Sequence, residues 1–445
     1  SSALGSCSCA AAWRRFSTHS QGWEFYLMIF TLGVSMELWV LLAYLLAGPT
    51  IWGILGMALY AGRRKMLLMH RPGTAIKENP PPLVSLLIPA KDEEARIKGC
   101  LESALAQDYP NLQVIAIDDR SADCTGAVMD DLARAHSNLQ IIHITQPPEP
   151  GWTGKNNALF TGTQHARGQW LLYVDSDVVL EADALRVAMG VVLRKKFDLL
   201  SLLPRLESHS FWESILVPLA ASAASTMYLI ALTNKTDGPK TTAFANGQFL
   251  LISREAYDAI GGHEAVRDRY CEDVEIARLL RVSGLRPRVA WGNEFAAVRM
   301  YSSLDAIVRG WSRIYYAARV GSPWRPLMAM TFLLVCCLSA AAAFGWGIWE
   351  LAHPAPGFWW IFFVSSWLSA SINHTITMLW LVGQMYAWSG NPRRNALCFP
   401  LAGGMLFLIM ARSVKMCITR KVEWRGTAYS HKMAQDLATP KPADV

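Results

Sequence analysis

The chain has 445 residues, of which 52% are hydrophobic, and a mean hydropathy of +0.20, so it is more apolar than an ordinary soluble protein. The formal net charge of +7 does not indicate a nucleic-acid partner, because many basic residues stand beside apolar runs, as they do at the faces of a membrane. The nine cysteines include no pair with the CxxC spacing of a zinc site, and we expect them to be reduced.

The first part of the chain predicts a membrane anchor. Residues 1–22 are rich in Ser, Ala and Cys and are either disordered or a presequence. Residues 23–62 are almost continuously apolar, and a bilayer core of about 30 Å needs about 20 residues of helix, so we expect an N-terminal transmembrane region with at least one crossing. The basic residues Arg63, Arg64 and Lys65 that follow predict that the next domain lies on the cytoplasmic side of the plasma membrane.

Residues 82–319 have the pattern of an α/β catalytic domain. Helical patterns at residues 93–107 and 125–136 alternate with short apolar runs, which lie at residues 83–89, 113–117, 140–144 and 170–174. This alternation predicts a parallel sheet covered by helices on both faces, in which ligands bind at the carboxyl ends of the strands. Polar residues just after these runs are therefore the candidate site residues.

Carboxylates follow three of these predicted strands. Segments 89–94 and 118–121 each carry acidic residues, and the run at residues 170–174 leads directly into Asp175-Ser176-Asp177. In an extended chain Asp175 and Asp177 point to the same side, and their hard oxygen ligands suit a Mg²⁺ or Mn²⁺ that bridges a diphosphate. A helix cap or a solvated loop explains one such cluster, but repetition at successive strand ends favours a binding site.

Glu272 and Asp273 stand directly before a helical pattern at residues 274–282. The helix dipole stabilises a carboxylate near a helix start, so a structural role is one interpretation. The functional interpretation makes Asp273 a general base that takes the proton of an acceptor hydroxyl.

Six motifs, taken in order, resemble glycosyltransferase family 2, whose members have the GT-A fold. They are VSLLIPAKDEEARI, AIDDRSADCT, PGWTGKNNAL, LLYVDSDVVL, GGHEAVRDRYCEDVEIARLLRVSG and RGWSRIYY, and they span about residues 82–317. PGWTGKNNAL, RMYSSLDAIVRGWSR and the late EWRG resemble the membrane-bound branch that includes hopene-associated and carotenoid-acid glycosyltransferases. Ceramide glucosyltransferases are a more distant likeness.

This resemblance implies an inverting, metal-dependent transfer of a sugar from a nucleotide-sugar donor, with UDP as the default nucleotide. Asp273 would be the catalytic base with Glu272 as its neighbour, and Asp177, with Asp175, would bind Mg²⁺ or Mn²⁺. Lys155, in GWTGKNN, would meet the diphosphate, although an ordinary surface lysine is the alternative interpretation. The residues that the resemblance implies for donor binding are Pro89, Ala90, Glu93, Asp119, Lys155 and Asp175.

The segment after the base departs from the family's processive members, which carry Gln-x-x-Arg-Trp. Arg309, Trp311 and Arg313 stand in that stretch, which favours transfer of a single sugar. The resemblance assigns these three residues to the acceptor or diphosphate side. Trp311 would either stack on a sugar or acceptor, or mark the membrane interface.

Further apolar segments predict more membrane contact. Residues 211–232 fall between motifs that would share one aqueous site, so we expect an interfacial or buried helix there. A C-terminal transmembrane region covers residues 324–417. Within it, residues 327–349 and 358–388 reach spanning length, and residues 397–411 are a third crossing, re-entrant or interfacial.

Membrane regions on both sides of a catalytic domain predict a lipid or lipid-like acceptor in the bilayer. The basic tail, residues 418–445, would contact a lipid headgroup or the donor diphosphate, or only mark the interface. A short-polysaccharide synthase is the alternative enzyme, and a non-catalytic membrane scaffold with the same fold is the alternative from another class. A transporter is disfavoured, because the predicted spans contain little that is polar beyond Asn373 and His374.

Overall fold

The computed structural model describes residues 36–69, 76, 80–227, 230–235, 242–317, 324–355, 357–419, 422–424 and 427–429. The predictions for residues 1–22 and for most of the basic tail lie outside the described residues. The chain divides into two compact units, which are described separately. One combines Ser1–Leu55 with Thr331–Met378, and the other combines Gly56–Met330 with Leu379–Val445.

An eight-stranded mixed sheet forms the centre of the second unit within the described residues. Its spatial order is β1 (Leu67–Leu68), β10 (Pro287–Trp291), β7 (Leu199–Leu203), β9 (Phe249–Ser253), β5 (Trp170–Val174), β2 (Val84–Ala90), β3 (Leu112–Asp119) and β4 (Leu139–Ile144). The central strands are apolar and buried along nearly their whole length, as expected of strands covered on both faces. The predicted α/β fold class and the four predicted strands are confirmed.

Strand β9 is the one element of this sheet that breaks the parallel pattern among the described strands. It pairs antiparallel with β5 on one side and with β7 on the other. The other neighbouring strands pair in parallel. The alternation of strands and helices along the sequence does not reveal β9, since a short apolar run has the same appearance in either direction.

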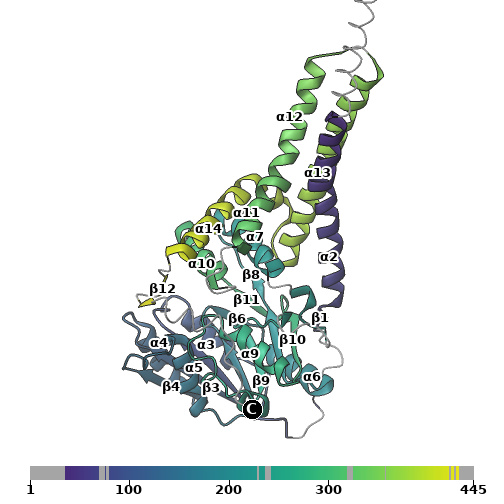
Figure 1. Ribbon diagram of the computed structural model, residues 1–445. Coiled ribbons are helices and arrows are strands. Elements are labelled where there is room, and N and C mark those ends of the chain that lie inside the picture. The colour runs from purple at the N-terminus through teal and green to yellow at the C-terminus, as the bar shows by residue number, and fades with distance from the viewer. Residues whose placement is uncertain are drawn as a thin grey trace, which may run out of the picture. The chain divides into compact units, whose positions relative to one another are not determined.

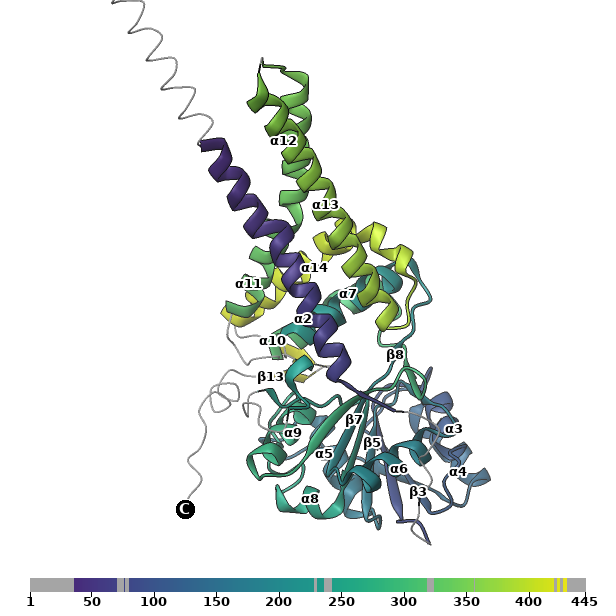
Figure 2. The ribbon, with the colours of Figure 1, turned by 90° about the vertical axis from the view of Figure 1, so that its right-hand side faces the viewer.

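Helices surround the strands of this sheet, as Figures 1 and 2 show. They are α3 (Ile97–Leu105), α4 (Thr125–Ala135), α5 (Gly154–Gln164), α6 (Ala184–Lys195), α8 (Arg254–Ala259) and α9 (Glu272–Val282). Helix α3 begins later than the pattern at residues 93–107 predicts, because Asp92 has a left-handed backbone (φ 53°) and residues 94–96 form a turn.

Helices α5 and α9 are the two that position the site. Thr153 caps α5 by accepting a hydrogen bond from the backbone N–H of Asn156 (3.2 Å), and α9 has acidic residues in its first turn and Arg281 in its last. Leu159 of α5 and Ile276 of α9 belong to one buried core cluster with side chains of β2, β3 and β5. Both helices are therefore fixed to the central strands by apolar packing.

A smaller three-stranded sheet among the described residues continues the chain beyond β5. Its order is β6 (Val178–Leu180), β11 (Ala296–Val298) and β8 (Arg205–Leu206). Between β5 and β6, the backbone N–H of Val178 donates to the carbonyl of Asp175 (3.1 Å) and closes a turn. Asp175-Ser176-Asp177 therefore turns the chain, and the extended conformation expected for this tripeptide is not what the structure has.

Three helices of the second unit pack on one another. They are α7 (Phe211–Met227), α10 (Leu304–Ala317) and α14 (Phe399–Thr419). Tyr315 of α10 donates to the carbonyl of Ala220 in α7 (2.7 Å), and Ser312 of α10 donates to the carbonyl of Ile409 in α14 (3.2 Å). The helix expected at residues 211–232 is thus α7 followed by the short turn η2 (Ile230–Leu232). The remaining short elements are η5 (Arg393–Cys398) and the paired strands β12 (Val422–Trp424) and β13 (Thr427–Tyr429).

A buried ion pair anchors the first turn of α7. Glu213 is fully buried, and Arg299 donates to both of its carboxylate oxygens at 3.0 Å. The hydroxyl of Ser210 and the backbone N–H of His209 also donate to Glu213, at 2.7 and 3.0 Å. Burial by itself would raise the pKa of Glu213, but these hydrogen bonds hold that pKa at about 2.

We expect Arg299→Met to lower the free energy of unfolding by about 2 kcal/mol near neutral pH, because the buried carboxylate of Glu213 loses its cation. The effect is not larger because solvent partly screens the exposed side of the Arg299 guanidinium. Wild-type protein keeps this contribution above the ordinary glutamate pKa and loses it as the pH falls towards the folded pKa of about 2. Denaturant unfolding of both proteins measures the difference. The control Arg134→Met breaks only the exposed pair with Asp131 and should change stability little.

The first unit consists of long apolar helical segments. They are η1 (Leu46–Thr50), the beginning of α2 (Ile51–Lys65), the end of α11 (Trp324–Phe332), η4 (Leu333–Leu338), α12 (Ser339–Ala352) and α13 (Phe358–Trp388) as far as Met378. Segments η1 and η4 are π-helical, and Pro49 inside η1 removes one backbone donor there. The hydroxyl of Tyr44 and the Nδ1 atom of His374 lie 3.1 Å apart, so the buried His374 has a hydrogen-bond partner within this unit.

Three helices among the described residues are long and apolar enough to cross a membrane by length and composition: Met36–Arg64, Pro326–Ala352 and Arg393–Thr419. The third includes residues 397–411, which the sequence left open, and it is longer than that run suggested. Helix α13, which was expected to span, is not among the three. Its Ser, Asn and His residues lower its mean hydropathy, although it has 31 residues.

Candidate active site

The predicted strand-end residues meet at one edge of the central sheet. Strands β3, β2 and β5 are parallel neighbours, and Ala90 at the end of β2 pairs with Asp118 of β3. Asp119 ends β3, and Asp175 follows directly after β5. Because parallel strands end on the same side, Ala90, Asp119 and Asp175 lie along one crevice.

Asp119 is buried and already has a cationic partner. The guanidinium of Arg120 donates to both of its oxygens, with Nε to Oδ1 at 2.7 Å and Nη2 to Oδ2 at 3.0 Å. Gly154 lies against the same carboxylate, since a Cβ at that position would come within 2.9 Å of Asp119 Oδ2. The start of α5 therefore sits beside Asp119, and Arg120 is a partner that the sequence did not suggest.

Glu93, Asp175 and Asp177 form an acidic cluster. Burial and the negative charges of Asp175 and Glu93 raise the pKa of Asp177 well above its usual range. Arg96 lies 3.4 Å from Glu93 and offsets part of this charge. The cluster favours the binding of a cation.

The donor set of this cluster fits Mg²⁺ or Mn²⁺. Among the described residues, no group of three or more His, Cys, Asp or Glu side chains is arranged so that it could hold a metal ion by itself. Mg²⁺ is usually held by only one or two carboxylates together with substrate phosphates, so a full protein cage is not required. Asp175 and Asp177 supply two carboxylates at the strand-end crevice, where a diphosphate would complete the coordination.

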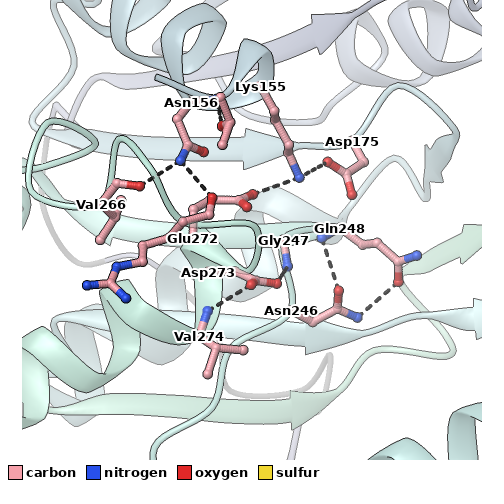
Figure 3. Close-up of polar contacts among 12 residues, drawn as sticks. Lys155, Asn156, Asp175, Asn246, Gly247, Gln248, Val266, Glu272, Asp273 and Val274 are labelled. Atoms are coloured by element: carbon pink, nitrogen blue, oxygen red, sulfur yellow. Dashed lines mark hydrogen bonds and ion pairs between the residues drawn. The ribbon is translucent and has the colours of Figure 1, made fainter. Parts of the chain in front are cut away.

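Lys155 lies in the first turn of α5 and bridges two carboxylates (Figure 3). Its ammonium is 2.8 Å from Asp175 Oδ1 and 2.8 Å from Glu272 Oε1. Burial alone would lower the pKa of Lys155, but Asp175, Glu272 and Asp273 together raise that pKa well above its usual value. Lys155 is therefore a charged group of the crevice and is not an isolated surface lysine.

Asp273 is held in place by two backbone donors at the start of α9 (Figure 3). The N–H of Gly247 donates to Oδ2 at 2.6 Å, and the N–H of Val274 donates to Oδ1 at 2.7 Å. Burial and the neighbouring charge of Glu272 raise the pKa of Asp273 to about 7, even though Lys155 and both N–H groups oppose the rise. A carboxylate with this pKa is suited to accept a proton near neutral pH.

Gly247 lies close to two charged side chains of the site. A Cβ there would lie 3.3 Å from Asp273 Oδ2 and 3.3 Å from Lys155 Nζ. Contacts this short leave little room for a side chain. The structure shows that this glycine faces the candidate base, which the sequence did not suggest.

His263 is a second residue that the sequence did not single out. It is buried, lies 2.9 Å from the hydroxyl of Tyr257, and lines the same cavity as Pro89, Lys155 and Asp273. Burial lowers the pKa of His263 to about 3, so its imidazole is neutral. The motif GGHE contains His263, but the sequence does not show that this side chain is buried and neutral and lines the cavity with Lys155.

The three residues expected on the acceptor or diphosphate side lie on α10. Arg309 is exposed and pairs with Asp305 one turn earlier on the same helix. Arg313 is half-buried. None of the three is among the described residues that line the cavity with Lys155 and Asp273.

Trp311 is packed inside the protein in this structure. Its side chain is only 4% exposed, and its ring centroid lies 5.9 Å from that of Tyr315. One apolar face of α10 turns towards α7 and α14, and Trp311 is on that face. A ring packed in this way presents no stacking surface for a sugar in this structure.

The strand-end acidic cluster, the bridging lysine and the backbone-held carboxylate are chemically suited to the transfer of a glycosyl group from a phosphorylated donor. Residues 50–436 match the model of glycosyl transferase family 21, and the chain belongs to that family. It is thus a glycosyltransferase; the finer resemblance to family 2 stays a prediction.

The expected likeness to carotenoid-acid glycosyltransferases is confirmed. The 4,4'-diaponeurosporenoate glycosyltransferase of Staphylococcus aureus (strain MRSA252) is 26% identical over 78% of this chain and 88% of its own length. The protein of the same name from strain USA300 is 28% identical over 52% of this chain and 60% of its own length.

Two solved structures are more remote. The mannosyltransferase PcManGT from Pyrobaculum calidifontis, in complex with GDP-Man and Mn²⁺, is 16% identical, with 87% of this chain and 98% of that chain covered and a TM-score of 0.47. S. aureus TarS 1-349 in complex with UDP-GlcNAc is 14% identical, with 78% and 95% covered and a TM-score of 0.35.

Proposed function

We propose that this glycosyltransferase transfers a single sugar from a UDP-sugar to a membrane lipid or lipid-like acceptor, with inversion at the anomeric carbon and with Mg²⁺ or Mn²⁺ as cofactor. The observation that carries the proposal is the position of Lys155. Its ammonium lies 2.8 Å from a carboxylate of the acidic cluster and 2.8 Å from Glu272, the residue next to the candidate base. One small region therefore holds groups for the leaving diphosphate and for the attacking hydroxyl.

In this mechanism Asp273 removes the proton of the acceptor hydroxyl as that oxygen attacks the anomeric carbon. The new carbon–oxygen bond forms on one face while the bond to the diphosphate oxygen breaks on the other, and the electron pair leaves with the nucleoside diphosphate. This single displacement inverts the anomeric centre. Lys155 stabilises the departing negative charge, and Asp175 and Asp177 would hold a metal ion that supplies further positive charge.

Donor specificity would come from the crevice beside the strand ends. Pro89, Ala90, Glu93 and Asp119 lie along it, and Asp119, paired with Arg120, is our candidate for contact with the nucleotide base. Single-sugar transfer is supported by the absence of Gln-x-x-Arg-Trp from residues 309–313.

A membrane acceptor is supported by the apolar helices and by the name of the relatives, which describes transfer to a carotenoid acid in those proteins. We propose an integral plasma-membrane protein, with transmembrane regions at residues 23–62 and 324–417 and a catalytic domain at residues 82–319 on the cytoplasmic side. Residues 211–232 would lie at the bilayer surface, the basic tail at residues 418–445 would contact headgroups, and nucleic acid would not be a partner.

The test is release of nucleoside diphosphate by the purified full chain in lipid vesicles. A panel of UDP- and GDP-sugars is supplied with Mn²⁺ or Mg²⁺ and a total membrane lipid extract as acceptor. Lipid-dependent release that EDTA abolishes supports the proposal and identifies the donor. Donor binding without release under any lipid would favour the scaffold alternative, and failure to bind any nucleotide sugar would contradict the proposal.

On the acid side of the pH–rate profile, we expect activity to fall at a pH far above the ordinary pKa of an aspartate. Asp273 must be deprotonated to act as the base, and burial beside Glu272 raises its pKa to about 7. The value of kcat/KM should therefore rise as the pH increases through this region. A profile measured from about pH 5 to about pH 9 checks this, and a constant rate over the lower half of that range would contradict the assignment.

A further inference from the structure

Asn156, the residue after Lys155, ties α5 to the segment that leads into the candidate base. Its side chain is fully buried. The amide nitrogen lies 2.7 Å from the carbonyl oxygen of Val266 (Figure 3), and it lies 2.9 Å from that of Arg269 and 3.2 Å from that of Arg267. These three carbonyls belong to one short segment that ends three residues before Glu272.

The orientation of the amide follows from its surroundings. If oxygen and nitrogen were exchanged, the oxygen would face three carbonyl oxygens and repel all of them, so the nitrogen must point to this segment. The amide oxygen has no hydrogen-bond partner among the described residues. A buried acceptor without a partner costs free energy, and this cost offsets part of what the hydrogen bonds of the amide nitrogen contribute to stability.

Two kinds of contact thus join the start of α5 to the segment before α9. The neutral contacts are those of Asn156 and the N–H of Thr153, which donates to the carbonyl of Arg267 at 2.8 Å. The charged contact is that of Lys155 with Glu272 at 2.8 Å. A bound diphosphate would compete with Glu272 for the ammonium of Lys155, because it carries more negative charge, whereas the carbonyls bound by Asn156 are neutral and unaffected.

We propose that Asn156 is a positioning residue that holds the Val266–Arg269 segment, and with it Asp273, in place when Lys155 turns from Glu272 to the donor diphosphate. This inference rests on the proposed function, since it takes Asp273 as the base and Lys155 as the diphosphate contact. Lys155 makes the contact that changes when the donor binds, and Asn156 makes the side-chain contact that stays.

Hydrogen exchange of the full chain in lipid tests this directly and does not depend on turnover. Without nucleotide, Asn156→Ala should exchange at residues 266–274 nearly as slowly as the wild type, because Lys155 still binds Glu272. With UDP and Mn²⁺, the same residues should exchange at least about tenfold faster in the variant than in the wild type. Equal protection of both proteins with nucleotide bound would overturn the inference.

Kinetics provide the second readout. We expect Asn156→Ala to lower kcat by about 10- to 100-fold, since a displacement of about 1 Å at a reacting group has an effect of this size, while the dissociation constant of UDP changes less than about threefold. Asn156→Ser keeps one short donor and should recover part of kcat. It also serves as the test protein if the alanine variant fails to fold.

The matched control is Asn391→Ala. Asn391 is also a buried asparagine that donates to a backbone carbonyl, that of Leu206 at 3.1 Å, but it lies outside the site. The Asn391→Ala variant should lower the thermal midpoint to a similar extent as Asn156→Ala, but its kcat should be unchanged. An equal loss of kcat in both variants would show that Asn156 has only a structural role and would contradict the inference. A wild-type protein that binds no nucleotide would instead contradict the proposed function, so the two failures are distinguishable.

Discussion

Asp273→Asn is expected to lower kcat by about 10²- to 10⁴-fold while donor binding stays nearly unchanged. The amide has the shape of the carboxylate but cannot accept the hydroxyl proton. The two carboxylate oxygens accept from the backbone N–H groups of Gly247 and Val274, so the amide keeps one of these hydrogen bonds, and Lys155 keeps its partner Asp175. Steady-state release of nucleoside diphosphate measures kcat, and calorimetric titration with UDP and Mn²⁺ measures binding.

The matched control for this variant is Glu275→Gln on the same helix. Glu275 is partly exposed and pairs with Arg278 one turn later, away from the cavity that Asp273 lines. The control should retain both kcat and donor affinity. Full activity of the Asp273 variant would remove the general base from the mechanism, and a parallel loss in the control would show that the start of α9 is merely sensitive to any change.

Asp177→Ala is expected to weaken donor binding by at least about tenfold and to remove its dependence on metal, because a divalent ion at the diphosphate contributes several kcal/mol. Asp177 stands in the acidic cluster, where Asp175 and Glu93 raise its pKa, so its carboxylate is the natural place for added positive charge. The affinity of wild type and variant for UDP, each measured with Mn²⁺ and with EDTA, gives the result.

Asp131→Asn is the control for the metal assignment. Asp131 is exposed on α4 and pairs only with neighbouring Arg134 among the contacts of the described chain, so its loss should leave metal-dependent binding unchanged. Equal affinity of the wild type for UDP with and without Mn²⁺ would contradict the metal assignment, whatever the Asp177 variant does.

The sequence by itself determined the class of fold and the edge of the sheet at which to search. Short apolar runs such as residues 170–174 alternate with helical patterns, which predicts buried strands of a parallel sheet, and parallel strands end on one side. Asp119, Asp175 and Asp177 could therefore be placed together before any coordinates were known. Glu272 and Asp273 could be identified because acidic pairs at a helix start recur in the family that the motifs resemble.

Tertiary structure decided what depends on contacts between distant segments. Strand β9 enters antiparallel between β5 and β7, and no local pattern states its direction. Trp311 is polar at one edge and apolar over its face, so it suits an interface or a core equally well, and only the packing of α10 against its neighbours buries it.

The same reason applies to the groups that complete the site. Gly247, His263 and Asn156 carry no charge and have no distinctive spacing, and their importance lies in which atoms they approach. Gly247 brings a backbone N–H to Asp273, and Asn156 joins α5 to the segment before α9. Charge patterns are visible along a chain because they are properties of single residues, whereas hydrogen-bond partners and burial are properties of pairs that the fold brings together.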